Sequence, residues 1–148
     1  MLNMENRTPI LQGEELLKLI PQRAPIVMVD AIYEVDAAGA TTGLTITNDN
    51  IFCSQGCLQE VGLIEHIAQS AAALAGYEPF KQGLPPKPGF IGEIKKCKLH
   101  RLPYTGETLH TRLEVKGEAA GVTLIAAQTC TTQGLVATCQ MKIFISPE

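Results

Sequence analysis

The longest pattern in this chain is an apolar, alanine-rich stretch from Gln59 to Tyr77. Its alanines, leucines and isoleucines fall on every side of a helix turning about 100° per residue, which predicts a helix that is buried all round. Two carboxylates interrupt the stretch: Glu60 at its start, where water can still reach it, and Glu65 well inside. Burying an ionisable group is costly unless the group is paired, neutralised or used in chemistry. Glu65 therefore requires an explanation.

The helical period places Glu65 on a stripe of mostly small side chains, namely Val61, Gly62, Ala68, Gln69 and Ala72. Small neighbours leave room for a ligand or for another backbone. Two interpretations of Glu65 stay open: a structural carboxylate satisfied by Gln69 and a backbone donor, or a catalytic group.

The rest of the chain predicts strands. Glu14–Ile20 reads as a short helix ended by a proline, and two strands follow, at 26–36 and 41–47, with the turn DAAG between them. Four more strands are predicted at 89–102, 107–118, 121–133 and 135–145. The predicted fold class is α+β, with a long antiparallel sheet curled around one buried helix. Such a sheet leaves edge strands that a second copy can cover, so we expect a dimer.

Composition limits the function classes. With 148 residues, 45% of them hydrophobic, the chain has the size of one domain, 1–148. A net charge of -3 and the lack of a long basic run argue against nucleic-acid binding. The first residues carry no basic start or apolar core of a signal peptide, and no apolar run approaches the ~18 residues of a membrane span. We expect a cytoplasmic protein without a membrane partner.

The cysteines are five, an odd number scattered without a framework, which suits reduced thiols in the cytosol: Cys53, Cys57, Cys97, Cys130 and Cys139. Cys53 and Cys57 could form half of a metal site, but no second ligand pair follows at zinc spacing. We expect neither a metal nor another cofactor, and interpret these two cysteines as small apolar residues of a loop.

Four segments, taken in order, resemble the hotdog-fold FabZ/FabA-like β-hydroxyacyl-ACP dehydratases. They are IPQRAPIVMVD (20–30), VGLIEHIAQSAAALAGY (61–77), FIGEIKKCKLHRLPYTGE (90–107) and GLVATCQMKIFI (134–145). The shared features are a Pro–Arg approach to the first strand, a helix with Glu and Gln four residues apart, a Phe-x-Gly strand leading to a proline turn, and a closing strand. Within this family the chain most resembles the FabZ-like branch of aryl polyene and flexirubin-type pigment biosynthesis.

The resemblance implies a dimeric hotdog fold, with a β-hydroxyacyl thioester carried on the phosphopantetheine arm of an acyl carrier protein as the substrate. Dehydration needs a base for the α-proton, an acid for the leaving hydroxyl, and donors for the thioester oxygen. Glu65 stands at the catalytic glutamate position of the family. The substrate-binding positions that the resemblance implies are Val61, Gly62, Gln69, Phe90 and Gly92.

The family's other catalytic residue, a histidine, is missing. It belongs to a Gly-His-Phe-Pro segment, and counting back from Glu65 places Phe52 on the phenylalanine and Ile51 on the histidine. Relatives that read Pro-His-Arg before the first strand correspond here to Pro21, Gln22 and Arg23. Neither isoleucine nor glutamine is a general acid or base at neutral pH.

Among the remaining candidates, His66 and Gln22 are auxiliary. His66 adjoins Glu65 but points about 100° away around the helix, so we expect it to pack at a dimer interface. His100 and His110 read as ordinary strand residues.

A basic cluster spans Lys95 to Arg101 in an otherwise acidic chain. Carrier proteins are acidic, so the resemblance suggests docking at Arg23, Lys96, Lys98 and Arg101. A solvated strand face is the alternative interpretation.

Three functions remain open. The first is a dehydratase in which Glu65 acts together with a group from elsewhere, in a homodimer or in a heterodimer with a related hotdog subunit. The second is a non-catalytic subunit that binds acyl carriers, and the third is a hotdog acyl thioesterase that uses Glu65 alone.

Overall fold

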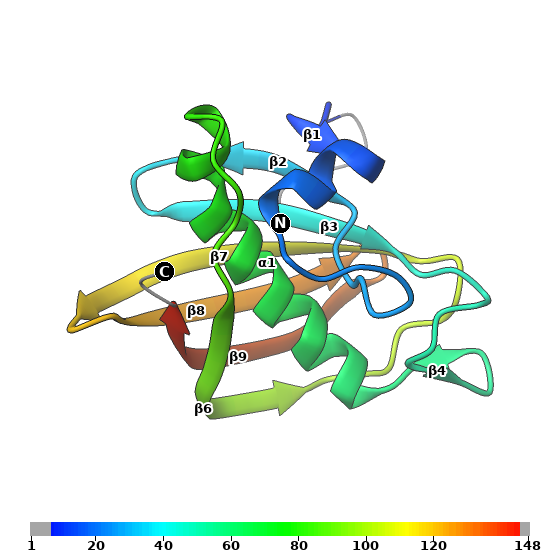
Figure 1. Ribbon diagram of the computed structural model, residues 1–148. Coiled ribbons are helices and arrows are strands. Elements are labelled where there is room, and N and C mark those ends of the chain that lie inside the picture. Colours follow the sequence, from blue (N-terminus) through cyan, green and yellow to red (C-terminus); the bar gives the residue numbers. More distant parts are fainter. Residues whose placement is uncertain (1–6, 146–148) are drawn as a thin grey trace.

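The structure is a computed structural model that describes residues 7–145. Most of the chain forms one long helix and one large sheet (Figure 1). The elements are β1 (Leu11–Gln12), the 3₁₀ helix η1 (Gly13–Leu19), β2 (Ala31–Val35), β3 (Gly39–Thr45), β4 (Cys53–Ser54), β5 (Cys57–Leu58), α1 (Glu60–Lys81), β6 (Gly89–Leu99), β7 (Thr108–Ala119), β8 (Val122–Thr131) and β9 (Gly134–Ile145).

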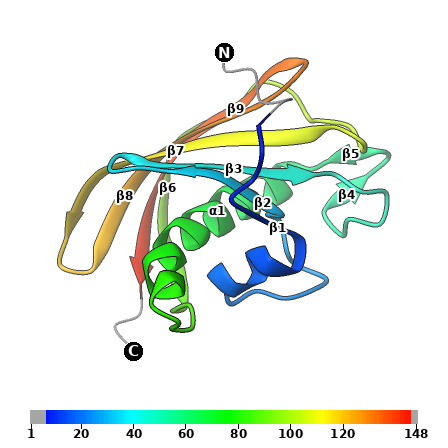
Figure 2. The ribbon, with the colours of Figure 1, turned by 90° about the horizontal axis from the view of Figure 1, so that it is seen from above.

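The large sheet is antiparallel throughout, with the strand order β1-β2-β3-β7-β8-β9-β6, and β4 and β5 form a separate small hairpin. Seen from above, the sheet curves over α1, which lies against one of its faces (Figure 2). The two edges of the sheet differ. β1 has two residues, whereas β6 has eleven, and among residues 7–145 no strand pairs with the outer side of β6.

Strand alternation places the core between α1 and the sheet. On β7, Leu109, Thr111 and Leu113 are fully buried, while the alternating residues His110 and Arg112 point to the other face. Ile67 and Ala71 of the helix pack with Leu113 and with side chains of β8 and β9. The other flank of α1 packs against η1 at Gly76, where a Cβ would stand 2.0 Å from the carbonyl oxygen of Leu19. Only glycine permits this approach.

The predicted elements are present, with shifted boundaries. The strand expected at 26–36 begins only at Ala31, because side chains of α1 bind the backbone before it. The helix expected at 59–77 continues to Lys81 and includes Pro79 in its last turn. The short helix expected at Glu14–Ile20 is the 3₁₀ helix η1.

The expectation that the long helix is buried all round is wrong for the single chain. Val61 is 59% exposed, and Ala75 is exposed on the same flank. Within residues 7–145, no helix is long and apolar enough to cross a bilayer.

Candidate functional site

Glu65 lies in the second turn of α1, half-buried. Its Oε2 accepts a hydrogen bond of 2.7 Å from Nε2 of Gln69, one turn further along the helix. The spacing of four residues places the two side chains one above the other on the helix surface. The predicted contact between the carboxylate and the amide is therefore present.

Gln69 is itself fixed by the segment that precedes β2. Its Nε2 also donates to the carbonyl oxygen of Ile26 at 2.7 Å, and its Oε1 accepts from the backbone N–H of Met28 at 2.5 Å. The Gln69 side chain is 0% exposed, and the three contacts allow only one orientation of its amide. The carboxylate of Glu65 thus meets a donor that cannot rotate away.

His66 lies inside the subunit, which makes the expectation of a dimer-interface position wrong. Its side chain is 0% exposed, with Nδ1 2.6 Å from the carbonyl oxygen of Met28 and Nε2 2.8 Å from Oγ1 of Thr111 on β7. Thr111 Oγ1 lies 2.7 Å from Oγ1 of Thr129 on β8. Burial lowers the pKa of His66 to about 4, so the ring is neutral at pH 7.

These contacts determine the direction of each hydrogen bond. A carbonyl only accepts, so Nδ1 of His66 carries the proton and Nε2 accepts from the Thr111 hydroxyl. The Thr111 oxygen then accepts from Thr129. The sequence analysis did not predict these hydrogen bonds, although threonines at inward-facing strand positions were a signal for them.

The start of α1 is the candidate oxyanion site. The amide of Gly62 already donates to the carbonyl of Gln59 at 3.0 Å, within the first turn. Gly62 is also needed for packing, since a Cβ there would stand 2.6 Å from Leu58 and 2.7 Å from Phe52. Val61 points to solvent next to it.

The loop before α1 carries the positions where the family histidine was sought. Phe52 packs against the core and its carbonyl accepts from the amide of Gln59, so it sits at the helix start, whereas Ile51 is 52% exposed. In the segment between η1 and β2, Oε1 of Gln22 is buried without a hydrogen-bond partner among the described residues. The Arg23 guanidinium turns back onto the carbonyls of Ile20 and Gln22 at 2.7 Å each.

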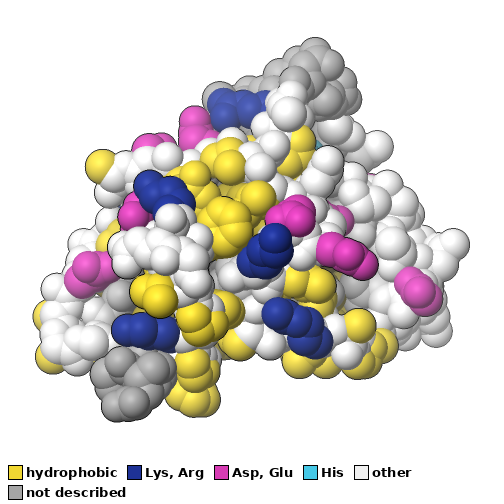
Figure 3. Space-filling view, turned by 45° about the horizontal axis from the view of Figure 1, so that its top comes forward, with side chains coloured by type: hydrophobic (Ala, Val, Ile, Leu, Met, Phe, Trp, Pro, Cys, Tyr) yellow, Lys and Arg dark blue, Asp and Glu magenta, His cyan; other side chains and the backbone are white. Residues whose placement is uncertain are grey.

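Strand β6 carries the other expected substrate-binding residues. Phe90 is 65% exposed, and a Cβ on Gly92 would stand 1.9 Å from the Phe144 ring, so this glycine makes space for an aromatic side chain of β9. The space-filling view of one face shows apolar groups gathered between scattered charges (Figure 3). Further large apolar side chains are exposed on β6, on its neighbour β9 and at the helix start. They are Ile91, Ile94, Leu99, Phe144 and Val61.

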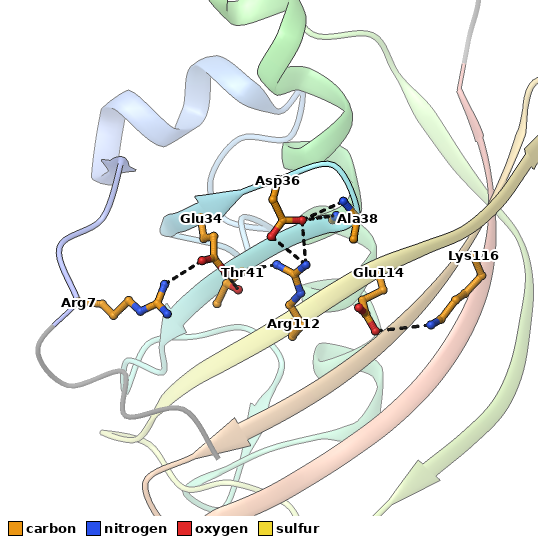
Figure 4. Close-up of polar contacts among 9 residues, drawn as sticks. Arg7, Glu34, Asp36, Ala38, Thr41, Arg112, Glu114 and Lys116 are labelled. Atoms are coloured by element: carbon orange, nitrogen blue, oxygen red, sulfur yellow. Dashed lines mark hydrogen bonds and ion pairs between the residues drawn. The ribbon is translucent and has the colours of Figure 1, made fainter.

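The opposite face of the sheet, called here the outer face, carries several basic residues. Lys96 and Lys98 line a broad hollow of about 1020 Å³ on it, together with Arg112 and Lys116. The last two are already paired, Arg112 with Glu34 and Asp36 and Lys116 with Glu114 (Figure 4).

Arg101 is held in a partly buried ion pair with Glu107, and its guanidinium holds the pKa of that carboxyl at about 2. The two remaining histidines lie outside α1, the helix that carries Glu65. His110 lies on the outer face beside the Tyr33 ring, and His100 is exposed just after β6.

Comparisons with known proteins identify the family and the fold. Residues 14–148 match the ApeP-like family, described as ApeP dehydratase. The 3-hydroxyacyl-[acyl-carrier-protein] dehydratase FabZ of Clostridium botulinum (strain Kyoto / Type A2) is 28% identical over 142 residues, covering 91% of this chain and 95% of the relative. The corresponding FabZ of Rickettsia conorii is 26% identical over 135 residues, covering 87% and 91%.

A solved structure shares the backbone arrangement. It is the dehydratase heterocomplex ApeI:P from Xenorhabdus doucetiae, with a TM-score of 0.82 at 14% identity over 90% of this chain and 91% of the other. The match in fold and the family match over nearly the whole length confirm the resemblance seen in the sequence. The protein has the α+β hotdog fold and belongs to the ApeP-like dehydratase family.

Proposed function

We propose that this chain is a 3-hydroxyacyl-[acyl-carrier-protein] dehydratase-like hydro-lyase subunit that acts on β-hydroxyacyl thioesters in fatty acid or polyene biosynthesis. The observation that carries the proposal is the orientation of Glu65. Its carboxylate is held by a fully buried amide, yet the residue is only half-buried and lies beside the exposed helix flank at Val61. A fixed, accessible carboxylate is what proton transfer to or from a bound substrate requires.

Dehydration removes a proton from the α-carbon and expels the β-hydroxyl as water, leaving a trans-2-enoyl thioester. One group must accept the α-proton and one must donate a proton to the leaving hydroxyl, and Glu65 performs one of these two transfers. A second group must perform the other. Ile51 and Gln22, at the positions where relatives carry histidine, cannot do so. We infer that the second group comes from another subunit.

The exposed edge supports the presence of that subunit. In the part of the chain that the structure describes, no strand pairs with the outer side of β6, and exposed apolar side chains line this strand and the helix start. Unpaired strand edges and clustered apolar groups are features that a neighbouring subunit covers. The Xenorhabdus doucetiae protein of similar fold is a dehydratase heterocomplex. We propose a related hotdog subunit, or a second copy of this chain, along β6.

A second candidate function is a non-catalytic subunit that completes the pocket of its partner. Ile51 and Gln22 favour it, because both histidine positions of the family lack an ionisable group.

One experiment separates these functions. A 3-hydroxyacyl carrier protein is incubated with this chain alone, with a related hotdog subunit alone, and with both, and the acyl group is weighed by mass spectrometry. Loss of water that requires this chain and disappears in Glu65→Gln supports the proposed activity. Loss of water that is unchanged in Glu65→Gln supports the non-catalytic subunit. Release of the acyl group would instead indicate a thioesterase, and an unchanged acyl group in every mixture would refute the dehydratase.

A further inference from the structure

The segment before β2 depends on the helix for its position. At Met28 the backbone N–H and carbonyl both bind side chains of α1, Gln69 and His66, rather than a neighbouring strand. The carbonyl of Ile26 binds Gln69 as well. Regular pairing in the sheet starts only with Ala31.

The hydrogen bonds of Met28 connect it both to the sheet and to the flank of the helix that carries Glu65. Towards the sheet, the His66 ring is held by Thr111, which is held by Thr129, and all three side chains are 0% exposed. Towards the helix flank, Met28 and Ile26 hold the Gln69 amide, whose Nε2 reaches Glu65. Hydrogen bonds on both sides of Met28, joined through the backbone of that residue, therefore connect β8 and the imidazole to the half-buried carboxylate.

We propose that His66 is a positioning residue for Glu65, acting through the carbonyl of Met28 and the amide of Gln69. It does not touch the substrate, because its ring is enclosed within the subunit and both nitrogens are occupied. A neutral ring suits this role, since Nδ1 must donate while Nε2 accepts. The inference rests on the proposed function, in which Glu65 transfers a proton.

The two ring nitrogens can be tested separately, because an asparagine can imitate the donor Nδ1 and a glutamine the acceptor Nε2. In His66→Asn, the amide nitrogen can take the place of Nδ1 and still donate to Met28. In His66→Gln, the longer side chain can place its amide oxygen where Nε2 was, to accept from the Thr111 hydroxyl, and leaves the Met28 carbonyl without its partner. Both substitutions remove the ring, so a purely structural role predicts similar losses of kcat for the two variants.

We expect His66→Gln to lower kcat by about tenfold or more with little change in KM, because a small displacement of a reacting group has large kinetic effects. His66→Asn should retain kcat within about threefold of the unsubstituted protein. His110→Gln, on the outer face, is the matched control. The assay uses the complex that dehydrates the 3-hydroxyacyl carrier protein and counts folded protein only. Equal kcat losses in the two His66 variants, or a loss confined to His66→Asn, would overturn the proposal.

A second measurement does not depend on turnover. With the side-chain carboxyl carbon of glutamate labelled, the NMR signal of Glu65 is assigned from its absence in Glu65→Gln. It should move in His66→Gln and stay near its original position in His66→Asn, and hydrogen exchange of the Met28 amide should accelerate only in the former. If these differences occur without turnover in any mixture, the proposed function fails while the coupling holds. If neither variant moves the Glu65 signal, the coupling is refuted.

Discussion

Thr111 and Arg112 are neighbours on β7 and face opposite sides of the sheet. The Thr111 side chain is fully buried and bonds to His66 and Thr129, whereas Arg112 lies on the outer face in ion pairs with Glu34 and Asp36 (Figure 4). Both faces are thus rich in polar contacts. They differ in access to water, which replaces a lost partner on the outer face but cannot do so under the helix.

We infer that function and stability depend mainly on the helix side, which is the face of the sheet that α1 covers. There, buried partners hold each polar side chain in one orientation, as the three contacts of Gln69 illustrate. On the outer face, pairs such as Lys116 with Glu114 are about half exposed, and solvent can take over either partner. Matched substitutions on the two faces test this difference directly.

The largest effect should come from Glu65→Gln. Removing a general acid–base group lowers turnover by about 10²- to 10⁴-fold, and glutamine can still accept from Gln69, so folding should be nearly unaffected. The measurement is the rate of trans-2-enoyl formation in the active complex. Glu34→Gln makes the same change on the outer face and should leave the rate unchanged. Equal rates for Glu65→Gln and the unsubstituted protein would contradict the assignment of Glu65.

His66→Leu should have the next largest effect. It leaves the Met28 carbonyl and the Thr111 hydroxyl buried without their partner, and each such group costs about 1–3 kcal/mol. We expect a loss of about 4 kcal/mol in the free energy of unfolding, measured by urea denaturation. His110→Leu, on the outer face beside Tyr33, should change it by less than about 1 kcal/mol. Similar losses for the two histidines would remove the proposed difference between the faces.

As the pH falls, the stabilising contribution of neutral His66 should be lost at a higher pH than that of the ion pair of Glu107. The unfolded chain protonates His66 below pH 6.5, whereas the folded protein keeps it neutral down to about 4. The unfolded state therefore binds more protons in this range, and stability falls by up to about 3 kcal/mol between pH 6.5 and 4.

The contribution of Glu107 to stability is lost at a lower pH than that of His66. The pKa of its carboxyl is about 2 in the folded protein, so its contribution is present above pH 4.5 and is lost as the pH falls towards 2. The test is the free energy of unfolding against pH, compared with that of His66→Asn, which lacks the first step. A curve with the same slope for both proteins between pH 6.5 and 4 would show that His66 is not the group responsible.

The smallest effect is expected for Lys116→Ala on the outer face. Its ion pair with Glu114 spans 3.5 Å between half-exposed side chains, and such pairs contribute less than about 1 kcal/mol. The loss should shrink further at high salt, where the pair is screened. A loss of several kcal/mol, independent of salt, would place the outer face on a level with the helix side.

Local patterns predicted the elements well, and the errors have physical causes. The segment 26–30 is rich in β-branched residues, yet its backbone binds Gln69 and His66 of the helix, so β2 begins at Ala31. A pattern records preferences of a segment and cannot report which distant group will satisfy its backbone. The extension of α1 past Tyr77 to Lys81 shows that a proline near a helix end is tolerated there.

The candidate site divides in the same way. The contact of Glu65 with Gln69 was predictable, because four residues along one helix settle it. The role of His66 was not: its direction around the helix was known, but whether that direction meets another subunit or β7 depends on how the sheet curves.

The sequence by itself determined the family, the order of strands and helix, and the carboxylate–amide pair, because these depend on short-range periodicity and on motifs within single segments. Only the tertiary structure decided that the helix leaves one flank open, that His66 is enclosed and neutral, and that Met28 links it to Gln69. Those features arise from contacts between residues about 40 positions apart, and no local pattern encodes such contacts.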